Sequence, residues 1–176
     1  MSAKKFKQIE KSFQLSDDIE KYFELLFQHL KPCGDDLILL TLTGHLIIEN
    51  LLEINLTRLL AIENLPGGKG RLGFSHKLNL VQAVVISREP GPNADVFCAI
   101  AEFNDLRNQI AHRLKNQEEI EKDVKSFIKN NHKIFDKKLS QNWTTAKQLR
   151  IYINKLCKFL FDVRVYFHKL DRQENE

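Results

Sequence analysis

The chain has 176 residues, a length typical of one domain built around one hydrophobic core. Apolar residues make up 43% and charged residues 28%, a balance that indicates a folded globular protein and excludes an intrinsically disordered chain. Because it contains only 7 Gly and 4 Pro, the sequence excludes collagen-like and mucin-like proteins and leaves little material for a turn-rich β-sandwich.

The three cysteines, Cys33, Cys98 and Cys157, are far apart and lack a Cys-x-x-Cys spacing. This odd, scattered set excludes a disulfide scaffold and favours reduced thiols in a cytoplasmic protein, with Cys98 and Cys157 as expected core residues. Residues 1–13 are basic but contain no apolar signal-peptide segment. The longest apolar stretch, 37–60, is interrupted by polar and charged residues, so we expect a buried helix there and no association with a membrane.

The net charge of +4 is unevenly distributed. Residues 1–110 hold 12 Lys and Arg against 14 Asp and Glu, whereas residues 111–176 hold 15 against 9. A basic half beside a nearly neutral body is typical of a protein that binds a polyanion. Lysines that are only solvated on helix faces give the same counts, so both interpretations stay open at this point.

Gly and Pro residues divide the first half of the chain into helical segments. A helix is predicted over 16–30, because Ser16 is a good N-cap, acids follow in the first turn, and apolar residues recur at three- and four-residue spacing. A second helix, buried on most sides, is predicted from 35 to about 64. The Gly-rich segment 65–70 is a predicted loop, but it lacks the spacing of a phosphate-binding loop.

Three or four further helices follow in the second half. The first of them is predicted from 76 to about 86, with Ser75 as its N-cap. The others are predicted over 93–114, over 116–130, which is strongly charged, and over 143–170, which has one continuous apolar side.

These elements predict an all-α fold, an up-and-down bundle of five or six helices. The sequence has no internal repeat and no linker long enough to separate two domains. We therefore expect a single domain over 1–176, with flexible ends at 1–14 and 171–176.

The helix predicted over 93–114 carries a polar stripe beside its apolar one. Asn104, Asn108 and His112 follow one another at four-residue intervals and thus share one face. Asparagine is a poor helix former, because its amide competes for nearby backbone groups. Together with Arg107 these residues cost helix stability without filling core volume, so we expect them to form a site. A satisfied polar network between helices, or simple exposure to water, is the alternative.

Residues 107–112, Arg-Asn-Gln-Ile-Ala-His, resemble the Arg-x(4–6)-His signature of the HEPN superfamily. A polar residue directly after the Arg, here Asn108, is typical of that superfamily. The preceding pattern, with Leu72-Gly73-Phe74, then Lys77 and Leu78 in a short helix, and a Pro/Gly break, is similar to the mannitol operon repressor branch. The resemblance covers the helix layout of about 35–170 and implies a HEPN-like helical bundle.

The resemblance also implies an activity. Many members are metal-independent RNA-cleaving enzymes that need no cofactor and pair their signature helices across the two-fold axis of a dimer. Arg107 and His112 would carry the chemistry, and Asn108 would support it. Because these two residues are about 140° apart around an ideal helix, a composite site in a homodimer is expected, with two copies of each residue in one cleft.

Further residues are predicted to assist this site. Asn104 and the nearby positions Glu49 and Asn50 of the second helix would support it, and Glu49 or Asn50 would orient Arg107. RNA would be guided by basic residues of the C-terminal half, namely Lys147, Arg150, Lys155 and Lys158.

A metal site was considered on the second predicted helix. His45, Glu49 and Glu53 lie there at four-residue intervals and are compatible with metal ligation. A dinuclear carboxylate bundle needs two Glu-x-x-His pairs, however, and the chain has none. We expect a buried polar seam rather than a metal at this place.

Two functions stay open. The first is an endoribonuclease that acts as a toxin or defence enzyme, with RNA, a second copy of the chain and an antitoxin or regulatory protein as partners. The second is a non-catalytic regulator of the mannitol operon repressor kind, which binds a protein or a nucleotide through the same surface. Both would be cytoplasmic.

Overall fold

The computed structural model describes residues 24, 26, 28–59, 72–88, 94–112, 116–134 and 142–173. Their elements are listed in chain order: η1 (Lys31–Cys33), α3 (Leu37–Leu59), α4 (Phe74–Arg88), α5 (Ala94–His112), α6 (Gln117–Asn130), η3 (His132–Ile134) and α7 (Thr145–Gln173). No strand occurs within these ranges, so the predicted all-α bundle is confirmed.

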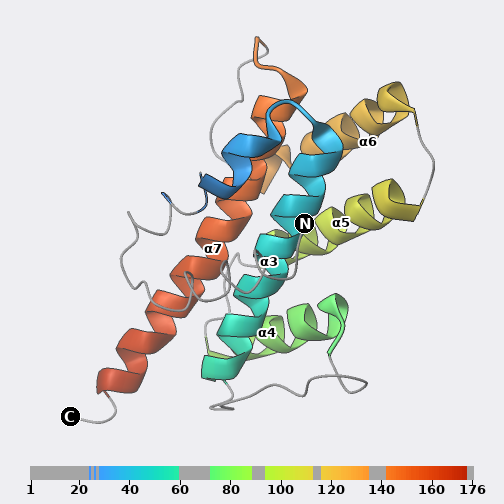
Figure 1. Ribbon diagram of the computed structural model, residues 1–176. Helices are drawn as coiled ribbons and strands as arrows, with labels where there is room; N and C mark the ends of the chain where they lie inside the picture. Colours follow the sequence, from blue (N-terminus) through green and yellow to red (C-terminus); the bar gives the residue numbers. More distant parts are fainter. Residues whose placement is uncertain are drawn as a thin grey trace.

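The two longest helices, α3 and α7, lie side by side and run in the same direction (Figure 1). Helices α4, α5 and α6 are stacked one above another and run across this pair. The chain thus returns from the end of α3 to the start of α7 through the three crossing helices. This order differs from simple up-and-down alternation, in which neighbouring helices are antiparallel.

Helix α3 is the centre of the bundle, and α7, α4 and α5 all pack against it. Residues 37–57 are long and apolar enough to cross a membrane, but 61% of their most apolar window is buried inside the fold. Packing against three helices therefore accounts for this apolar composition, as expected for a core helix.

The close approach of α3 and α7 depends on Gly44. A Cβ atom at this position would lie 2.7 Å from Cδ1 of Ile153 and 3.0 Å from its Cγ1 and Cγ2 atoms. Ile153 is completely buried, so it has little room to move away. Farther along the same contact, the Asn55 amide donates to the carbonyl oxygen of Leu160 at 3.0 Å. Gly44 precedes Asn55 in α3, and their partners Ile153 and Leu160 follow the same order in α7. The two helices are therefore parallel.

The periodic apolar positions of the later helices are buried as predicted. In α7 these are Leu149, Ile153, Leu156, Leu160 and Val163, and in α6 they are Ile120, Val124 and Ile128. Helix α6 begins with a capping box, in which Asn116 accepts from the backbone N–H of Glu119 and the Glu119 side chain accepts from that of Asn116.

Several expectations need correction. Helix α4 begins at Phe74, so Ser75 lies inside the helix and is not its N-cap. Helix α7 continues to Gln173, so residues 171–173 are helical rather than part of a flexible end. Cys98 is exposed, although Cys33 and Cys157 are buried, because it lies on the outer side of α5.

Other predicted features fall partly or wholly outside the described residues. Most of the helix predicted over 16–30 is outside them, although Glu24, Leu26 and residues 28–30 are helical. The loop predicted over 65–70 and the end of the second predicted helix, 60–64, are also outside.

We predict that Gly44→Ala lowers the free energy of unfolding, because the new methyl group overlaps Ile153, and overpacking of this kind costs about 1–3 kcal/mol. The gain in helix propensity, about 1 kcal/mol, opposes this loss. The contact is isolated by repeating the substitution in an Ile153→Val background, which lacks the nearest atom, Cδ1. Urea unfolding should show a smaller loss there, and equal losses in both backgrounds would contradict the predicted overlap.

Candidate functional site

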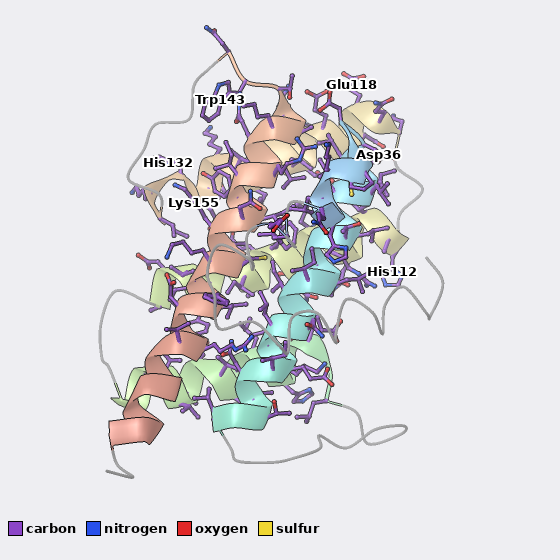
Figure 2. The ribbon with its side chains drawn as sticks, turned by 60° about the vertical axis from the view of Figure 1, so that its left-hand side comes forward. Asp36, His112, Glu118, His132, Trp143 and Lys155 are labelled. Carbon is purple, nitrogen blue, oxygen red and sulfur yellow. The ribbon has the colours of Figure 1, made fainter. Side chains whose placement is uncertain are left out.

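The residues of the site predicted on α5 lie outside the buried stripe of that helix. Phe103, Leu106 and Ile110 are buried and fix the helix against the core. Asn104, Arg107 and Asn108 are half-buried, and His112 is exposed in the last turn, where it complements the helix dipole. Figure 2 shows His112 at the edge of the molecule. The predicted catalytic residues are therefore reachable from solvent.

Arg107 is held by its neighbour. Its Nη1 donates to Oδ1 of Asn108 at 2.9 Å. Among the described residues, no carboxylate forms an ion pair with this guanidinium. A half-buried positive charge thus faces a neutral amide, with N–H groups left over for a ligand.

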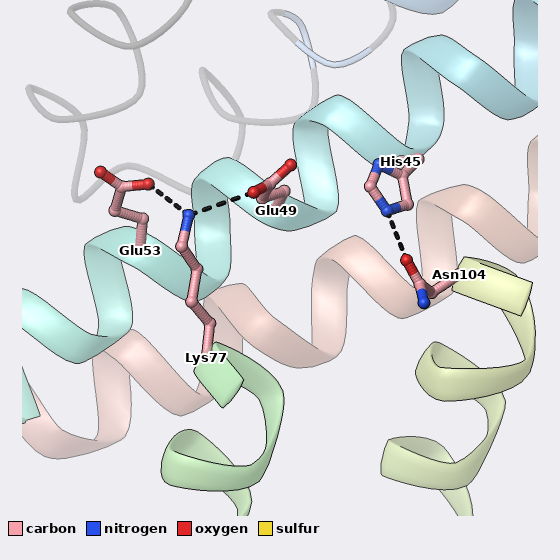
Figure 3. A network of polar contacts seen from close by, with 5 residues as sticks. All are labelled: His45, Glu49, Glu53, Lys77 and Asn104. Carbon is pink, nitrogen blue, oxygen red and sulfur yellow. Dashed lines mark hydrogen bonds and ion pairs between the residues drawn. The ribbon is translucent and has the colours of Figure 1, made fainter. Parts of the chain in front are cut away.

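A buried hydrogen bond joins α3 to α5. His45, only 4% exposed, donates from Nε2 to Oδ1 of Asn104 at 2.9 Å (Figure 3). The imidazole also stacks on the ring of Phe74, with centroids 4.6 Å apart and an interplanar angle of 25°. The Nδ1 atom is buried without a hydrogen-bond partner in the described structure. Since Asn104 Oδ1 can only accept, Nε2 carries a proton, and in the neutral form of the ring Nδ1 is then the unprotonated nitrogen.

The surroundings of His45 favour this neutral form. Burial lowers the pKa of the imidazole, and the positive charges of Arg107 on α5 and Lys77 on α4 lower it further. The hydrogen bond to Asn104 and the carboxylate of Glu49 raise the pKa, but they do not outweigh the other effects.

A second polar cluster joins α3 to α4. Lys77, which is 1% exposed, places its Nζ 3.2 Å from Oε1 of Glu49 and 2.6 Å from Oε2 of Glu53 (Figure 3). The two carboxylates are 24% and 32% exposed, so they keep part of their hydration while they neutralise the buried ammonium group.

The contacts of this cluster also bear on whether His45, Glu49 and Glu53 are metal ligands or polar links between helices. Both carboxylates bind Lys77, whereas His45 binds Asn104. No group of three or more His, Cys, Asp or Glu side chains that could hold a metal ion occurs in the part of the chain that the structure describes. In the described structure, these three side chains form polar contacts between α3 and its neighbours α4 and α5.

The predicted supports of Arg107 are only partly where we expected them. Asn104 lies one turn before it on the same flank and is bound by His45. Glu49 binds Lys77 instead of Arg107. Asn50 is buried, its Oδ1 has no hydrogen-bond partner among the described residues, and it does not bond to Arg107.

The predicted RNA-binding residues of α7 are engaged in other contacts. Lys147 lies 4.5 Å from the centre of the Trp143 ring, and Lys158 pairs with Asp162. Arg150 donates to the carbonyl oxygen of Gly34 and so ties α7 to the start of α3. Figure 2 shows Lys155 and His112 on opposite sides of the molecule. One protomer therefore does not bring Lys155 next to His112.

Lys77 was expected only as part of the family resemblance, and its burial and its carboxylate partners were not predicted, although a signal was present. Phe74, Lys77, Leu78 and Val81 follow the three- and four-residue spacing of a buried stripe, so Lys77 occupies a core position. A lysine at such a position needs a buried counter-charge. The carboxylates at Glu49 and Glu53, one turn apart on the most apolar helix, meet that need.

Comparisons with known proteins add no relatives: no protein-family model, no curated protein and no solved structure matches this chain.

We predict that His45 makes folding less stable in mild acid. The pKa of its imidazole is lowered from 6.5 in the folded protein, so below pH 6.5 the unfolded chain binds a proton that the folded protein does not. Between pH 7.5 and 5.5 this effect lowers the free energy of unfolding by up to about 1.4 kcal/mol. His45→Gln keeps an N–H donor but cannot titrate, so urea unfolding should show a weaker pH dependence.

His29 serves as the internal reference. Burial lowers the pKa of its imidazole as well, so His29 also makes the free energy of unfolding fall in mild acid. This contribution is the same in the wild type and in His45→Gln. Equal pH dependence of the wild type and His45→Gln would show that His45 is not held neutral.

Proposed function

We propose that this chain is a metal-independent endoribonuclease of HEPN type, acting as a toxin or defence enzyme through a site shared between two copies. The observation that carries the proposal is the placement of an accessible guanidinium without a carboxylate partner in the described structure, five residues before an exposed imidazole on one helix. An RNA phosphate provides the missing negative charge.

RNA supplies its own nucleophile, and therefore the protein has only to move protons and stabilise charge. The 2′-oxygen forms a bond to phosphorus and gives its proton to one His112, while the bond from phosphorus to the 5′-oxygen breaks. The second His112 protonates that departing oxygen. Arg107 stabilises the additional negative charge on phosphorus. The products are a 2′,3′-cyclic phosphate and a 5′-hydroxyl.

Helix geometry is the reason for two copies. Arg107 and His112 are about 140° apart around α5, so one helix cannot direct both side chains squarely at one phosphate. A two-fold axis beside α5 would place Arg107 of one copy near His112 of the other. The proposed partners are RNA, a second copy of this chain, and an antitoxin or regulatory protein that restrains the activity in the cytoplasm.

The basic residues of α7 have a more limited part in this proposal. Lys147, Lys155 and Lys158 would contact RNA away from the cleaved bond, since Lys155 is on the opposite side from His112. Arg150 is better explained as a link to Gly34 than as an RNA contact.

The first test is cleavage of single-stranded RNA in the presence of EDTA. His112→Ala and Arg107→Ala should each slow cleavage by about 100-fold or more, because proton transfer and charge stabilisation are each worth at least this factor. RNA with a 2′-deoxy nucleotide at the cleaved position should stay intact. The products are identified by their cyclic phosphate ends.

A matched control is available in His132, an exposed histidine that bonds to the carbonyl oxygen of Lys129. It lies on the side of the molecule away from His112 (Figure 2). His132→Ala should cleave like the wild type, and His112→Ala should keep its free energy of unfolding to within about 0.5 kcal/mol. Intact RNA with the folded wild type, or full activity of His112→Ala, would exclude the proposed enzyme.

The shared site predicts complementation between inactive variants. When equal amounts of Arg107→Ala and His112→Ala are unfolded together and refolded, half of the dimers contain both chains, and the shared cleft of each keeps one Arg107 and one His112. Activity should therefore exceed that of either variant alone, which lacks both copies of one residue, and stay below half of the wild-type level. Absence of recovery in a mixture shown to contain mixed dimers would contradict a site built from two copies.

A further inference from the structure

The exposed side of α6 has a basic edge. Helix α6 buries its apolar stripe against the fold and leaves the opposite side open to solvent. Lys122, Lys125 and Lys129 are exposed there and follow one another at three- and four-residue spacing, so they lie along one edge of this side. Lys125 pairs with Glu121 at 2.9 Å, whereas neither Lys122 nor Lys129 forms an ion pair with another described residue.

The other edge of the same side borders an acidic groove. This groove, of about 240 Å³, lies between α6 and α5, and the buried side chains of Leu106 and Phe127 give it an apolar floor. Its carboxylates come from both helices and are Glu102, Asp105 and Asp123. Asn131, at the end of α6, donates from Nδ2 to Oε2 of Glu102 at 2.7 Å. Glu102 is therefore held beside the C-terminal end of α6, close to the level of Lys129.

Ser126 lies on the boundary between the basic edge and the acidic groove. At about 100° per residue, its side chain is about 40° around α6 from Lys122 and about 60° from Asp123, and these two residues are on opposite sides of it. Ser126 is exposed and lines the groove. A surface with opposite charges on the two sides of one line can bind a copy of itself, because each charge then meets its opposite.

Charge determines how two such surfaces fit together. A two-fold axis that runs along α6 turns the basic edge of one copy onto the acidic groove of the other and leaves the two α6 helices parallel. Residues at the same level along α6 then meet, which brings Lys129 to Glu102 and Lys122 to the end of the groove that contains Asp123. A two-fold axis across α6 would instead place lysines against lysines and carboxylates against carboxylates, and like charges that face each other oppose association.

We propose that the basic edge and the acidic groove form a self-complementary docking surface for a second copy of this chain, related to the first by a two-fold axis along α6. Lys129 of each copy pairs with Glu102 of the other. Exposed ion pairs alone contribute little, but the aliphatic stem of the lysine also covers the apolar floor of the groove and excludes water from it. Neither Arg107 nor His112 lines this groove, so the contact is separate from the two-fold axis that the proposed enzyme requires.

The first test is a disulfide cross-link at the axis. Ser126 faces its own copy across this axis, so Ser126→Cys should give covalent dimers when oxidised glutathione is added to the full chain. Cys98→Ser is present in every variant, because Cys98 is the exposed one of the three native cysteines. Ser87→Cys, at an exposed serine of α4, is the control and should stay monomeric on a denaturing gel. No cross-link at Ser126, or equal yields at both positions, would overturn the docking surface.

Charge reversal tests the pairing of the edge with the groove, with the yield of the Ser126→Cys cross-link as the readout. Lys122→Glu with Lys129→Glu makes the edge acidic, and Glu102→Lys with Asp105→Lys makes the groove basic. Each of these double variants should cross-link at least tenfold less than the parent, because like charges then face each other. Mixing the two should restore the yield in dimers that contain one chain of each kind, which are recognised by their size when one chain carries a tag.

Lys158→Glu is the matched control, since it makes the same change of charge on the exposed surface of α7 and should leave the yield at the parent level. If the groove variant does not fold, because Glu102 bonds to Asn131, Asp105→Lys alone supplies the basic groove. Restored yield in the mixture supports the docking surface. Full cross-linking of the folded edge variant alone, or no recovery in the mixture, contradicts it. The cross-link reports on α6 only, so its absence would leave the proposed RNA cleavage untouched.

Discussion

The burial of α3 is the constraint on which the rest of the structure depends. A helix covered by α7, α4 and α5 takes several of its polar side chains out of water, and these gain stability from partners on the neighbouring helices. His45 finds Asn104 on α5, Glu49 and Glu53 find Lys77 on α4, and Asn55 finds a carbonyl oxygen of α7. Each of these hydrogen bonds forms only when the partner helix packs on one particular side of α3. The polar residues of α3 therefore help to specify where α4, α5 and α7 lie around it.

This constraint explains how much could be predicted from the sequence. Burial along α5, α6 and α7 follows a period of three to four residues, so the helices and most of their core positions were predicted correctly. The parallel course of α3 and α7 was not predicted, because it depends on Gly44 meeting Ile153, a contact between residues far apart in the chain. Periodicity gives each helix an apolar side but does not say which other helix covers it.

In the candidate site, too, the residues of one helix could be predicted from the sequence, whereas their contacts with other helices could not. The residues of α5 were recognised because asparagines are unusual in a core-forming helix. Their partners were not, since the sequence does not reveal that Lys77 would take both carboxylates of α3 or that His45 would face Asn104. Cys98 illustrates the opposite error, because an apolar neighbourhood in sequence indicated burial for a residue on the outer side of α5.

The two positive charges next to α3, Lys77 on α4 and Arg107 on α5, have different partners. Lys77 on α4 binds Glu49 and Glu53 of α3, whereas Arg107 on α5 donates to the neutral amide of Asn108. Both positive charges lower the pKa of the His45 imidazole. Under the proposed function, the guanidinium of Arg107 would meet its negative charge in an RNA phosphate.

The opposite flank of α5 has the reverse character. There a groove between α5 and α6 is lined by Glu102, Asp105 and Asp123, and Glu102 accepts a hydrogen bond from Asn131. Negative charges on this side repel a polyanion, while the donors on the other side attract it. Helix α5 therefore presents acidic side chains to this groove, whereas the guanidinium of Arg107 is outside its lining. Under the proposed function, RNA would approach from the flank of Arg107, and a second copy would bring His112 to the same phosphate.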